Sequence, residues 1–262
     1  MTHISCLPVC QECLDAMHPL AGRLCSVCGE RVLSSLAGSM QDELFQCLLC
    51  RRAAPPFTKA VAYGSYQGGL RDMIHLLKYA GVLPAASVLG RMVGDAIASL
   101  EPLFESRPVL VVPVPLHKSK RRQRGFNQAE LIARATLKSQ PRGLFRLTDD
   151  ILERKRDTRS QIGMTNHQRR ENLRGAFLVS HPEEINGREI LLVDDVLTTG
   201  ATAAECARVL RRAGAMRVWV ATVARTMKLA SNEDKLESFN VPEFQPVNFK
   251  NFENTEGSTV IS

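Results

Sequence analysis

Two adjacent acids followed by a short polar turn form the segment of this sequence with the clearest chemistry. Residues 190–202 read ILLVDDVLTTGAT, so an apolar run ends in Asp194 and Asp195. Two adjacent carboxylates can accept hydrogen bonds from a pair of neighbouring hydroxyl groups, such as the vicinal hydroxyls of a ribose. The free backbone N–H groups at the start of a following helix bind phosphate well. One short segment therefore has the groups needed to hold both the sugar and the phosphate of a ribose phosphate.

The turn after the acids is suited to an anion. Gly200 lets the backbone approach a ligand closely. The residues expected to hold the phosphate, by hydroxyl or by backbone N–H, are Thr198, Thr199, Gly200, Ala201 and Thr202. The alternative is an ordinary strand-to-helix turn with Thr202 as the N-cap and a solvated acidic pair. The segment contains neither the GxxxxGK[ST] pattern nor the Rossmann fingerprint, and the whole string favours a ligand site.

Cysteines crowd the start of the chain in pairs that are typical of zinc sites. Seven of the eight lie in the first 50 residues, and six form the CxxC pairs Cys10/Cys13, Cys25/Cys28 and Cys47/Cys50. Two CxxC turns supply four thiolates, which is a complete tetrahedral zinc site. The spacing from CSVCGE to CLLC favours Cys25, Cys28, Cys47 and Cys50 as ligands of a structural Zn²⁺. Pairing of Cys10 and Cys13 with Cys25 and Cys28 is the alternative.

Two other uses of these cysteines are less compatible with the sequence. Disulfides rarely persist in the cytosol, and no βαβ pattern surrounds the pairs as it would in a thioredoxin-like redox motif. The cysteine-rich segment is also too short and too poor in apolar residues to fold well unaided. Zinc, which contributes about 10–16 kcal/mol to small zinc modules, would supply much of its stability. Cys206 lies in a helical pattern and is interpreted as a small core residue.

Two stretches concentrate the positive charge of a chain whose formal net charge is +7. HKSKRRQR at 117–124 holds five fixed cations, and the segment 154–174 holds seven cations against two acids. Such density attracts pyrophosphate, nucleotides or a nucleic-acid backbone. Either stretch taken alone is equally compatible with a solvated cationic face.

Helices and strands alternate through the body of the chain and must position these residues. Apolar periodicity predicts helices over 68–81, 86–100, 126–137 and 202–213, and strands over 108–116, 175–179, 188–193 and 216–223. This order predicts an α/β domain with a mainly parallel sheet. Ligands bind outside the carboxyl ends of the strands in such sheets, which is where the acids are expected.

Changes in composition and in apolar periodicity predict three parts: a zinc-ribbon-like module over 1–56, the α/β domain over 57–225 and a disordered tail over 226–262. No apolar run approaches the roughly 18 residues needed to span a bilayer. The N-terminus also lacks the pattern of a secretion signal. We therefore expect a cytoplasmic protein with no membrane span.

The string VDDVLTTGAT matches the signature of type I phosphoribosyltransferases, which bind 5-phosphoribosyl-1-pyrophosphate (PRPP). The surrounding sequence resembles more specifically the ComF/GntX family of competence-associated proteins. This resemblance covers about residues 10–225 and rests on LKYAG, VPVPLHKSKRRQRGFNQAELIAR, ERKRDTRSQIGMTNHQRRENLRGAF and the cysteine-rich front. Three complete CxxC pairs, where the family leads one to expect four, and the tail after Arg225 depart from it.

The resemblance implies a phosphoribosyltransferase-like fold and a site for PRPP with Mg²⁺. The loop over 116–125 would hold pyrophosphate through Lys118, Lys120, Arg121, Arg122 and Arg124. The segment 154–174 would be a mobile loop, and Arg159 and Arg169 would act in catalysis with Asp194 and Asp195.

At the level of function, the resemblance implies phosphoribosyl transfer to an unidentified acceptor and a part in DNA uptake during natural transformation. Single-stranded DNA and the DNA-uptake machinery would then be partners. The alternative is a protein without catalytic activity that senses PRPP or a nucleotide, or that binds single-stranded DNA.

Overall fold

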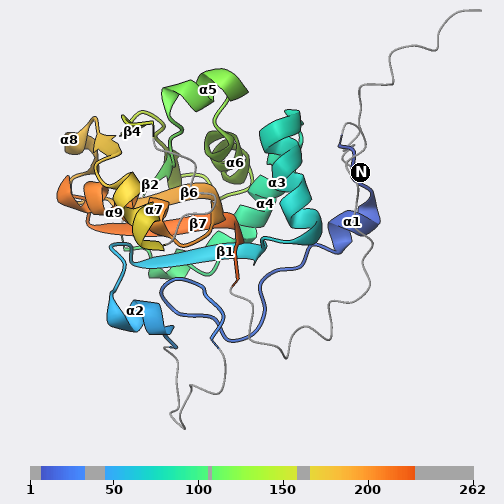
Figure 1. The fold of residues 1–262 in the computed structure, drawn as a ribbon, viewed down its shortest axis with the longest axis horizontal. Helices are drawn as coiled ribbons and strands as arrows, with labels where there is room; N and C mark the ends of the chain where they lie inside the picture. The colour runs from blue at the N-terminus through green and yellow to red at the C-terminus, as the bar shows by residue number, and fades with distance from the viewer. Residues whose placement is uncertain (1–6, 33–44, 106–107, 158–165, 228–262) are drawn as a thin grey trace, which may run out of the picture. The chain divides into compact units, whose positions relative to one another are not determined.

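The computed structural model describes residues 7–32, 45–105, 108–157 and 166–227, and within them the chain alternates between helices and strands (Figure 1). The helices are α1 (Gln11–Asp15), α2 (Leu48–Arg52), α3 (Gly68–Ala80), α4 (Ala85–Ile97), the 3₁₀ helix η2 (Glu101–Leu103), α5 (Lys118–Arg124), α6 (Gln128–Leu137), α7 (Asn166–Leu173), α8 (Pro182–Ile185) and α9 (Ala201–Arg212). The strands are β1 (Lys59–Ser65), β2 (Val109–Pro113), β3 (Phe145–Leu147), β4 (Leu152–Arg154), β5 (Phe177–Val179), β6 (Glu189–Leu197) and β7 (Arg217–Arg225).

The main sheet has five strands in the order β1-β7-β6-β2-β3, and every pairing in it is parallel. The strands β4 and β5 pair with each other, antiparallel, in a separate two-stranded sheet. The predicted α/β class with a mainly parallel sheet is confirmed. Parallel strands are usually covered on both faces, which explains why β2 and β6 read as nearly continuous apolar runs.

Alternate residues of each central strand enter two separate cores. On β6, Leu191 and Val193 pack with residues of α3, α4 and α6. Ile190 and Leu192 pack on the other side with residues of α8 and α9. This division follows from the two-residue period of a strand. Figure 1 shows α3, α4 and α6 grouped together, apart from α7, α8 and α9.

The junction between β2 and β6 is the point where the chain connections diverge. The connection from β2 runs through α6 on one face to β3, whereas the connection from β6 runs through α9 on the other face to β7. Ligands of open α/β sheets bind in the crevice at such a switch point, outside the carboxyl ends of the strands. The acids at the end of β6 lie at this junction.

The structure reproduces most of the predicted helices to within a few residues. α3 ends where Gly81 adopts a left-handed conformation with φ of 66°. α6 begins after Asn127, whose side chain accepts a hydrogen bond of 3.1 Å from the N–H of Ala129. The strand predicted over 188–193 is longer than expected, because β6 continues through both acids to Leu197. The strand near 175–179 belongs to the small β4-β5 sheet rather than to the main one.

The first part of the chain runs along the edge strand β1. The N–H of Ala60 donates a 2.7 Å hydrogen bond to the carbonyl of Val27, and the N–H of Leu20 donates one of 2.6 Å to the carbonyl of Tyr63. The predicted division at residue 56 stays a prediction. Apart from residues 226 and 227, the predicted tail lies outside the described residues. Among the described helices, none is both long enough and apolar enough to cross a membrane.

Candidate functional site

The acidic pair lies where β6 loses one of its neighbours. Pairing with β2 ends at Pro113 and Val193, and the N–H of Val114 then donates to the carbonyl of Val193 at 2.9 Å. Beyond that point the recorded pairing of β6 is with β7 alone, from Asp194 opposite Thr222 onward. The backbone of the two acids is therefore open on the side facing the end of β2.

Asp195 is buried and holds a cation from another part of the chain. Its side chain forms an ion pair between Oδ2 and Nζ of Lys78, on the last turn of α3. Lys78 is itself only 15% exposed. Burial lowers the pKa of Lys78 to about 8, although the charge of Asp194 opposes this shift. Sequence reasoning placed Lys78 in the LKYAG motif but gave it no role.

Asp194 is the more accessible of the two acids. Desolvation raises the pKa of its carboxyl to about 6, while the charges of Lys78 and Arg154 act in the opposite direction. Its Oδ1 accepts a 2.8 Å hydrogen bond from the N–H of Asp195. Arg154, at the end of β4, stacks at 5.5 Å from the ring of Phe177 and is a second cation that sequence reasoning left without a specific role.

The turn after β6 presents its polar groups to the surface. Thr198 and Thr199 are exposed, Ala201 is buried and Thr202 is partly buried. Gly200, not Thr202, is the N-cap of α9, with φ of 77°. A Cβ added to Gly200 would meet only Cδ1 of Leu197, at 3.9 Å, so the space beside this backbone is open. The structure thus brings the predicted phosphate turn and the acids to one edge.

The segment expected as a pyrophosphate loop is a helix, so that prediction of its structure is wrong. α5 covers Lys118–Arg124, and Nδ1 of His117 accepts a 3.3 Å hydrogen bond from the N–H of Ser119 as its cap. Lysine, arginine and glutamine favour helices, and the density of charge concealed this. Exposed cations on α5 are Lys118, Arg121 and Arg122, and partly buried ones are Lys120 and Arg124.

The second cationic segment is only partly described. It begins with the buried guanidinium of Arg154 and ends in α7. Arg159 lies outside the described residues, and so does the side chain of Arg169, whose backbone is helical. Their predicted roles in catalysis stay predictions.

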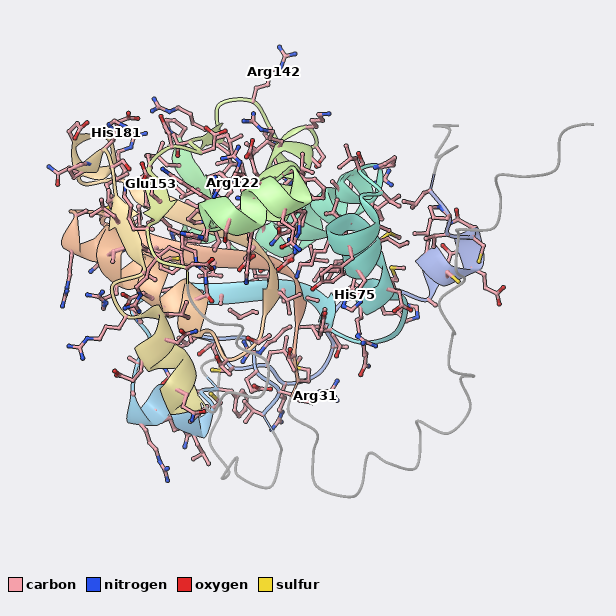
Figure 2. All side chains as sticks on the ribbon, turned by 45° about the horizontal axis from the view of Figure 1, so that its top comes forward. Arg31, His75, Arg122, Arg142, Glu153 and His181 are labelled. Atoms are coloured by element: carbon pink, nitrogen blue, oxygen red, sulfur yellow. The ribbon has the colours of Figure 1, made fainter. Side chains whose placement is uncertain are left out.

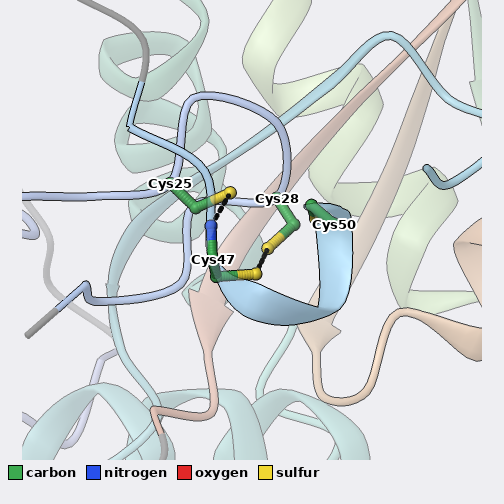
Figure 3. Close-up of side chains that lie close together, drawn as sticks. All are labelled: Cys25, Cys28, Cys47 and Cys50. Carbon is green, nitrogen blue, oxygen red and sulfur yellow. Dashed lines mark hydrogen bonds between the residues drawn. The ribbon is translucent and has the colours of Figure 1, made fainter. Parts of the chain in front are cut away.

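Four of the six paired cysteines form a cluster (Figure 3). The sulfur atoms of Cys25, Cys28, Cys47 and Cys50 all lie within 4.8 Å of one another. Ligand sulfurs of a tetrahedral zinc, with Zn–S of about 2.3 Å, lie about 3.8 Å apart. The distance of 3.7 Å between the sulfurs of Cys28 and Cys47 fits this geometry. The cluster could hold a metal ion such as zinc.

The cluster is the set that the sequence favoured over the alternative pairing. Cys10 and Cys13 lie at the start of α1, where both are exposed, and they are not part of the cluster. A hydrogen bond from the N–H of Cys47 reaches the sulfur of Cys25 at 3.3 Å. The side-chain hydrogen bond with Cys28 lowers the pKa of Cys25 to about 4, so one thiolate is already favoured without a metal.

A buried arginine connects this cluster to the sheet. Nη2 of Arg225, the last residue of β7, lies 3.0 Å from Oε2 of Glu30 and 3.7 Å from the sulfur of Cys28. Arg225 is opposite Leu197, the residue that precedes the phosphate turn. The cysteine cluster therefore contacts the end of β7, which pairs with the end of β6 that leads into the turn. Sequence reasoning gave no sign of this contact, which joins residues 197 positions apart.

Comparisons with known proteins agree with this arrangement of elements. A model of the phosphoribosyl transferase domain family matches residues 142–255 of the chain. The chain is 32% identical over 217 residues to the DNA utilization protein YhgH of Escherichia coli, which covers 78% of this chain and 91% of that protein.

Two competence proteins are also similar. Competence protein F of Haemophilus influenzae is 29% identical over 228 residues, which are 82% of this chain and 96% of that protein. Competence protein ComFC of Bacillus subtilis is 25% identical over 211 residues, which are 79% of each chain.

Proposed function

The chain belongs to the ComF family of competence-related proteins with a phosphoribosyltransferase domain, and on this premise we propose that it binds PRPP with Mg²⁺ and transfers the phosphoribosyl group to an acceptor. The proposal rests on one observation: two accessible groups lie at the same edge of the main sheet. Asp194 is a partly exposed carboxylate, and the open backbone of Gly200 follows it at the start of α9. A ribose 5-phosphate fits this combination of acceptors and N–H donors.

The edge of the sheet at Asp194 and Asp195, called the acid edge from here on, has the oxygen ligands that Mg²⁺ prefers. Magnesium takes oxygen ligands and is commonly held by one or two carboxylates together with substrate phosphates. Asp194 is the available carboxylate, since Asp195 is engaged by Lys78. When bound, Mg²⁺ would neutralise charge on the pyrophosphate group.

The cations around the edge would act on the departing pyrophosphate. Cleavage of the bond to the anomeric carbon leaves negative charge on pyrophosphate, and fixed cations stabilise that charge best when they are already in place. Lys78 and Arg154 are both partly buried and close enough to act on the charge of Asp194, and Arg124 of α5 is close enough to act on the charge of Lys78. α5, next in sequence after the end of β2, contributes further cations at the surface.

The assignment of individual residues follows from these positions. Asp194 would bind the ribose and the cation, and Asp195 would hold Lys78 beside them. Thr198, Thr199, Gly200, Ala201 and Thr202 would hold the phosphate of the ribose. Lys118, Lys120, Arg121, Arg122 and Arg124 would face the pyrophosphate, now from a helix. Arg159 and Arg169 would act from the segment 154–174, which we expect to close over the site.

A thermal-shift titration tests ligand binding directly. Ribose 5-phosphate or PRPP with Mg²⁺ should stabilise the protein by about 2.7 kcal/mol at a hundredfold excess over its Kd. Asp194→Asn should weaken binding about 10- to 100-fold, because a hydrogen bond to a charged group contributes about 1.5–3 kcal/mol. The matched control is Asp95→Asn, an exposed acid on α4. No shift with either ligand, or equal loss in both variants, contradicts the proposal.

Release of pyrophosphate then separates an enzyme from a sensor. The protein is incubated with PRPP, Mg²⁺ and a panel of purine and pyrimidine bases, and free pyrophosphate is measured. Release that depends on one base and disappears in Asp194→Asn supports transfer. Tight binding of PRPP with no release for any base supports the alternative of a sensor without catalytic activity.

The exposed cations of α5 favour a second function, the binding of single-stranded DNA. The names of the relatives, competence protein and DNA utilization protein, support a role in the uptake or use of DNA. Lys118, Arg121 and Arg122 are exposed on one short helix. Replacing Arg122 by Ser should weaken binding and reduce the salt dependence by about one phosphate contact. Affinity that does not change with salt contradicts this function.

A further inference from the structure

One of the three CxxC pairs stays outside the cysteine cluster. Cys10 and Cys13 are both exposed, whereas Cys25 and Cys50 of the cluster are buried. Among the described residues, the cluster is the only group of three or more His, Cys, Asp or Glu side chains placed to hold a metal ion. Two thiolates supply only half of a tetrahedral zinc site. Two neighbouring thiols at a surface are, however, the groups that thiol–disulfide exchange uses.

The two thiols of this pair lie close together. The N–H of Cys13 donates a 3.4 Å hydrogen bond to Sγ of Cys10, so the four residues form a tight turn at the start of α1. This hydrogen bond, followed by one from the Cys13 thiol, lowers the pKa of Cys10, and the hydrogen bond to Cys10 raises the pKa of Cys13. Because the thiolate is the nucleophile in disulfide exchange, the pair has one attacking sulfur and one that keeps its proton.

The turn is fixed to the α/β domain on both sides. Leu7 before it and Met17 after it are buried in the core that contains α3 and α4. The carbonyl of Cys13 and the side chain of Met17 face Gly69 at the start of α3, where an added Cβ would lie 3.6 and 3.1 Å from them. Figure 2 shows α1 beside α3, the helix on which His75 is labelled. A packed segment therefore presents the two thiols at the surface.

From these observations we propose that Cys10 and Cys13 are a redox-active pair that reduces an external disulfide by thiol–disulfide exchange. The thiolate of Cys10 attacks one sulfur of the external disulfide, the bond between the two external sulfurs breaks, and one thiol is released. Cys13 then loses its proton and attacks Sγ of Cys10, which forms the Cys10–Cys13 disulfide and releases the second thiol.

This exchange balances without any other reactant. The external disulfide gains two electrons, the pair loses two, and the protons of Cys10 and Cys13 end on the two released thiols. The disulfide of the pair is transient in this use, unlike the persistent disulfides that the cytosol disfavours. The proposal does not depend on the ribose phosphate site.

The acids beside the pair indicate which disulfides react best. Glu12 lies between the two cysteines in the sequence, and its charge acts on both thiols. Asp15 follows on the same short helix, where it accepts a 2.7 Å hydrogen bond from Nε2 of Gln11. Since like charges repel, this surface disfavours anionic disulfides such as oxidised glutathione and favours cationic ones such as cystamine. The expected substrate is therefore a disulfide with neutral or positively charged surroundings.

Reaction of the zinc-bound, full-length chain with cystamine tests the pair. After alkylation of the remaining thiols, peptide mapping by mass spectrometry should find the Cys10–Cys13 disulfide, with the zinc retained. In Cys13→Ser the exchange should stop halfway, with cysteamine joined to Cys10. Cys10→Ser, which lacks the attacking thiolate, should react about tenfold or more slowly. Cys206→Ala, which removes a buried cysteine outside the cluster, should react as the wild type does.

Two results would overturn the pair. One is a disulfide among the clustered cysteines, with loss of zinc, before any bond forms between Cys10 and Cys13. The other is an additional zinc that Cys10→Ser abolishes, because the pair would then be half of a shared metal site.

A comparison of two disulfides tests the substrate class. The rate with cystamine divided by the rate with oxidised glutathione should fall about threefold in Glu12→Gln at low ionic strength. The same ratio should fall in the wild type as salt is added, because salt screens exposed charges. A ratio that neither change affects would overturn the preference for cationic disulfides.

Discussion

The cysteine cluster and the acid edge are built in opposite ways. All four clustered cysteines come from residues 25–50, and among the described residues of this segment, 25–32 and 45–50, few apolar side chains are buried. The acid edge joins groups from α3, β4 and β6 on top of two extensive cores. A local site can be predicted from the spacing of its residues, and we expect it to need a metal for stability. A site assembled from distant segments has the sheet beneath it and needs no ligand to persist.

The sharpest way to test this difference is to remove one clustered thiol. Cys28→Ser should reduce the zinc content from one equivalent per chain to near zero and unfold the segment around it, since metal binding in such modules contributes about 10–16 kcal/mol. Elemental analysis and limited proteolysis measure both effects. Cys10→Ser, the exposed cysteine outside the cluster, is the matched control. Equal metal loss in the control would support the alternative pairing.

A variant of Arg225 tests whether the cysteine cluster and the acid edge are independent of each other. Arg225→Met should lower the zinc affinity about 10- to 100-fold, as loss of outer-shell partners commonly does. It should also destabilise the protein by about 3–5 kcal/mol, because Glu30, a buried carboxylate, loses the cation of its ion pair. Zinc release to a chelating dye and chemical denaturation report these effects. Arg146→Met, which breaks an exposed pair with Glu184, should cost about 1 kcal/mol or less.

A further variant separates loss of zinc from loss of folding. In Arg225→Met combined with Glu30→Leu, both charges of the ion pair are removed together, so no carboxylate is left without this cation. Faster zinc release from this folded double variant supports a direct role of Arg225 on the sulfur of Cys28. A wild-type rate of release would assign Arg225 to the ion pair alone.

The smallest expected effect concerns the acid edge without ligand. Burial raises the pKa of Asp194 to about 6, so its folded form holds a proton more tightly than the unfolded chain does. Its stabilising contribution is complete below about pH 4 and is lost as the pH rises through about 6. Asp194→Asn should therefore gain stability relative to the wild type over this range.

The gain in the free energy of unfolding is limited in size, because Asp194 is not fully buried. Each pKa unit corresponds to about 1.4 kcal/mol, which sets an upper bound of about 3 kcal/mol. Because Asp194 is partly exposed, solvent screening reduces this to about 1–2 kcal/mol. Denaturant titrations of both proteins between pH 4 and 8 measure the difference. If the free energies of unfolding of the two proteins changed with pH in parallel, the raised pKa of Asp194 would be contradicted.

The sequence was informative where neighbours along the chain determine structure. The period of Leu70, Ile74 and Leu77 predicted α3, and the apolar run before Asp194 predicted the central strand. The ligand loop that the family resemblance implied over 116–125 was wrong, because His117 caps a helix of residues that are good helix formers. Sequence reasoning also could not find the pairing of Lys78 with Asp195 or the contact of Arg124 with Tyr79. Those depend on which helices the sheet brings together, and spacing does not encode this.

The ion pair between Lys78 and Asp195 changes the net charge that an anion meets at this edge of the sheet. Asp195 is already paired with a cation of the chain itself, so the sheet edge at Asp194 and Asp195 carries less net negative charge than its two carboxylates alone imply. A polyanion therefore meets less repulsion on entry, at a place where two aspartates in sequence would otherwise repel it. Lys78 thus works as an internal counter-ion, which would make this acidic edge compatible with the phosphorylated ligand that we propose for it.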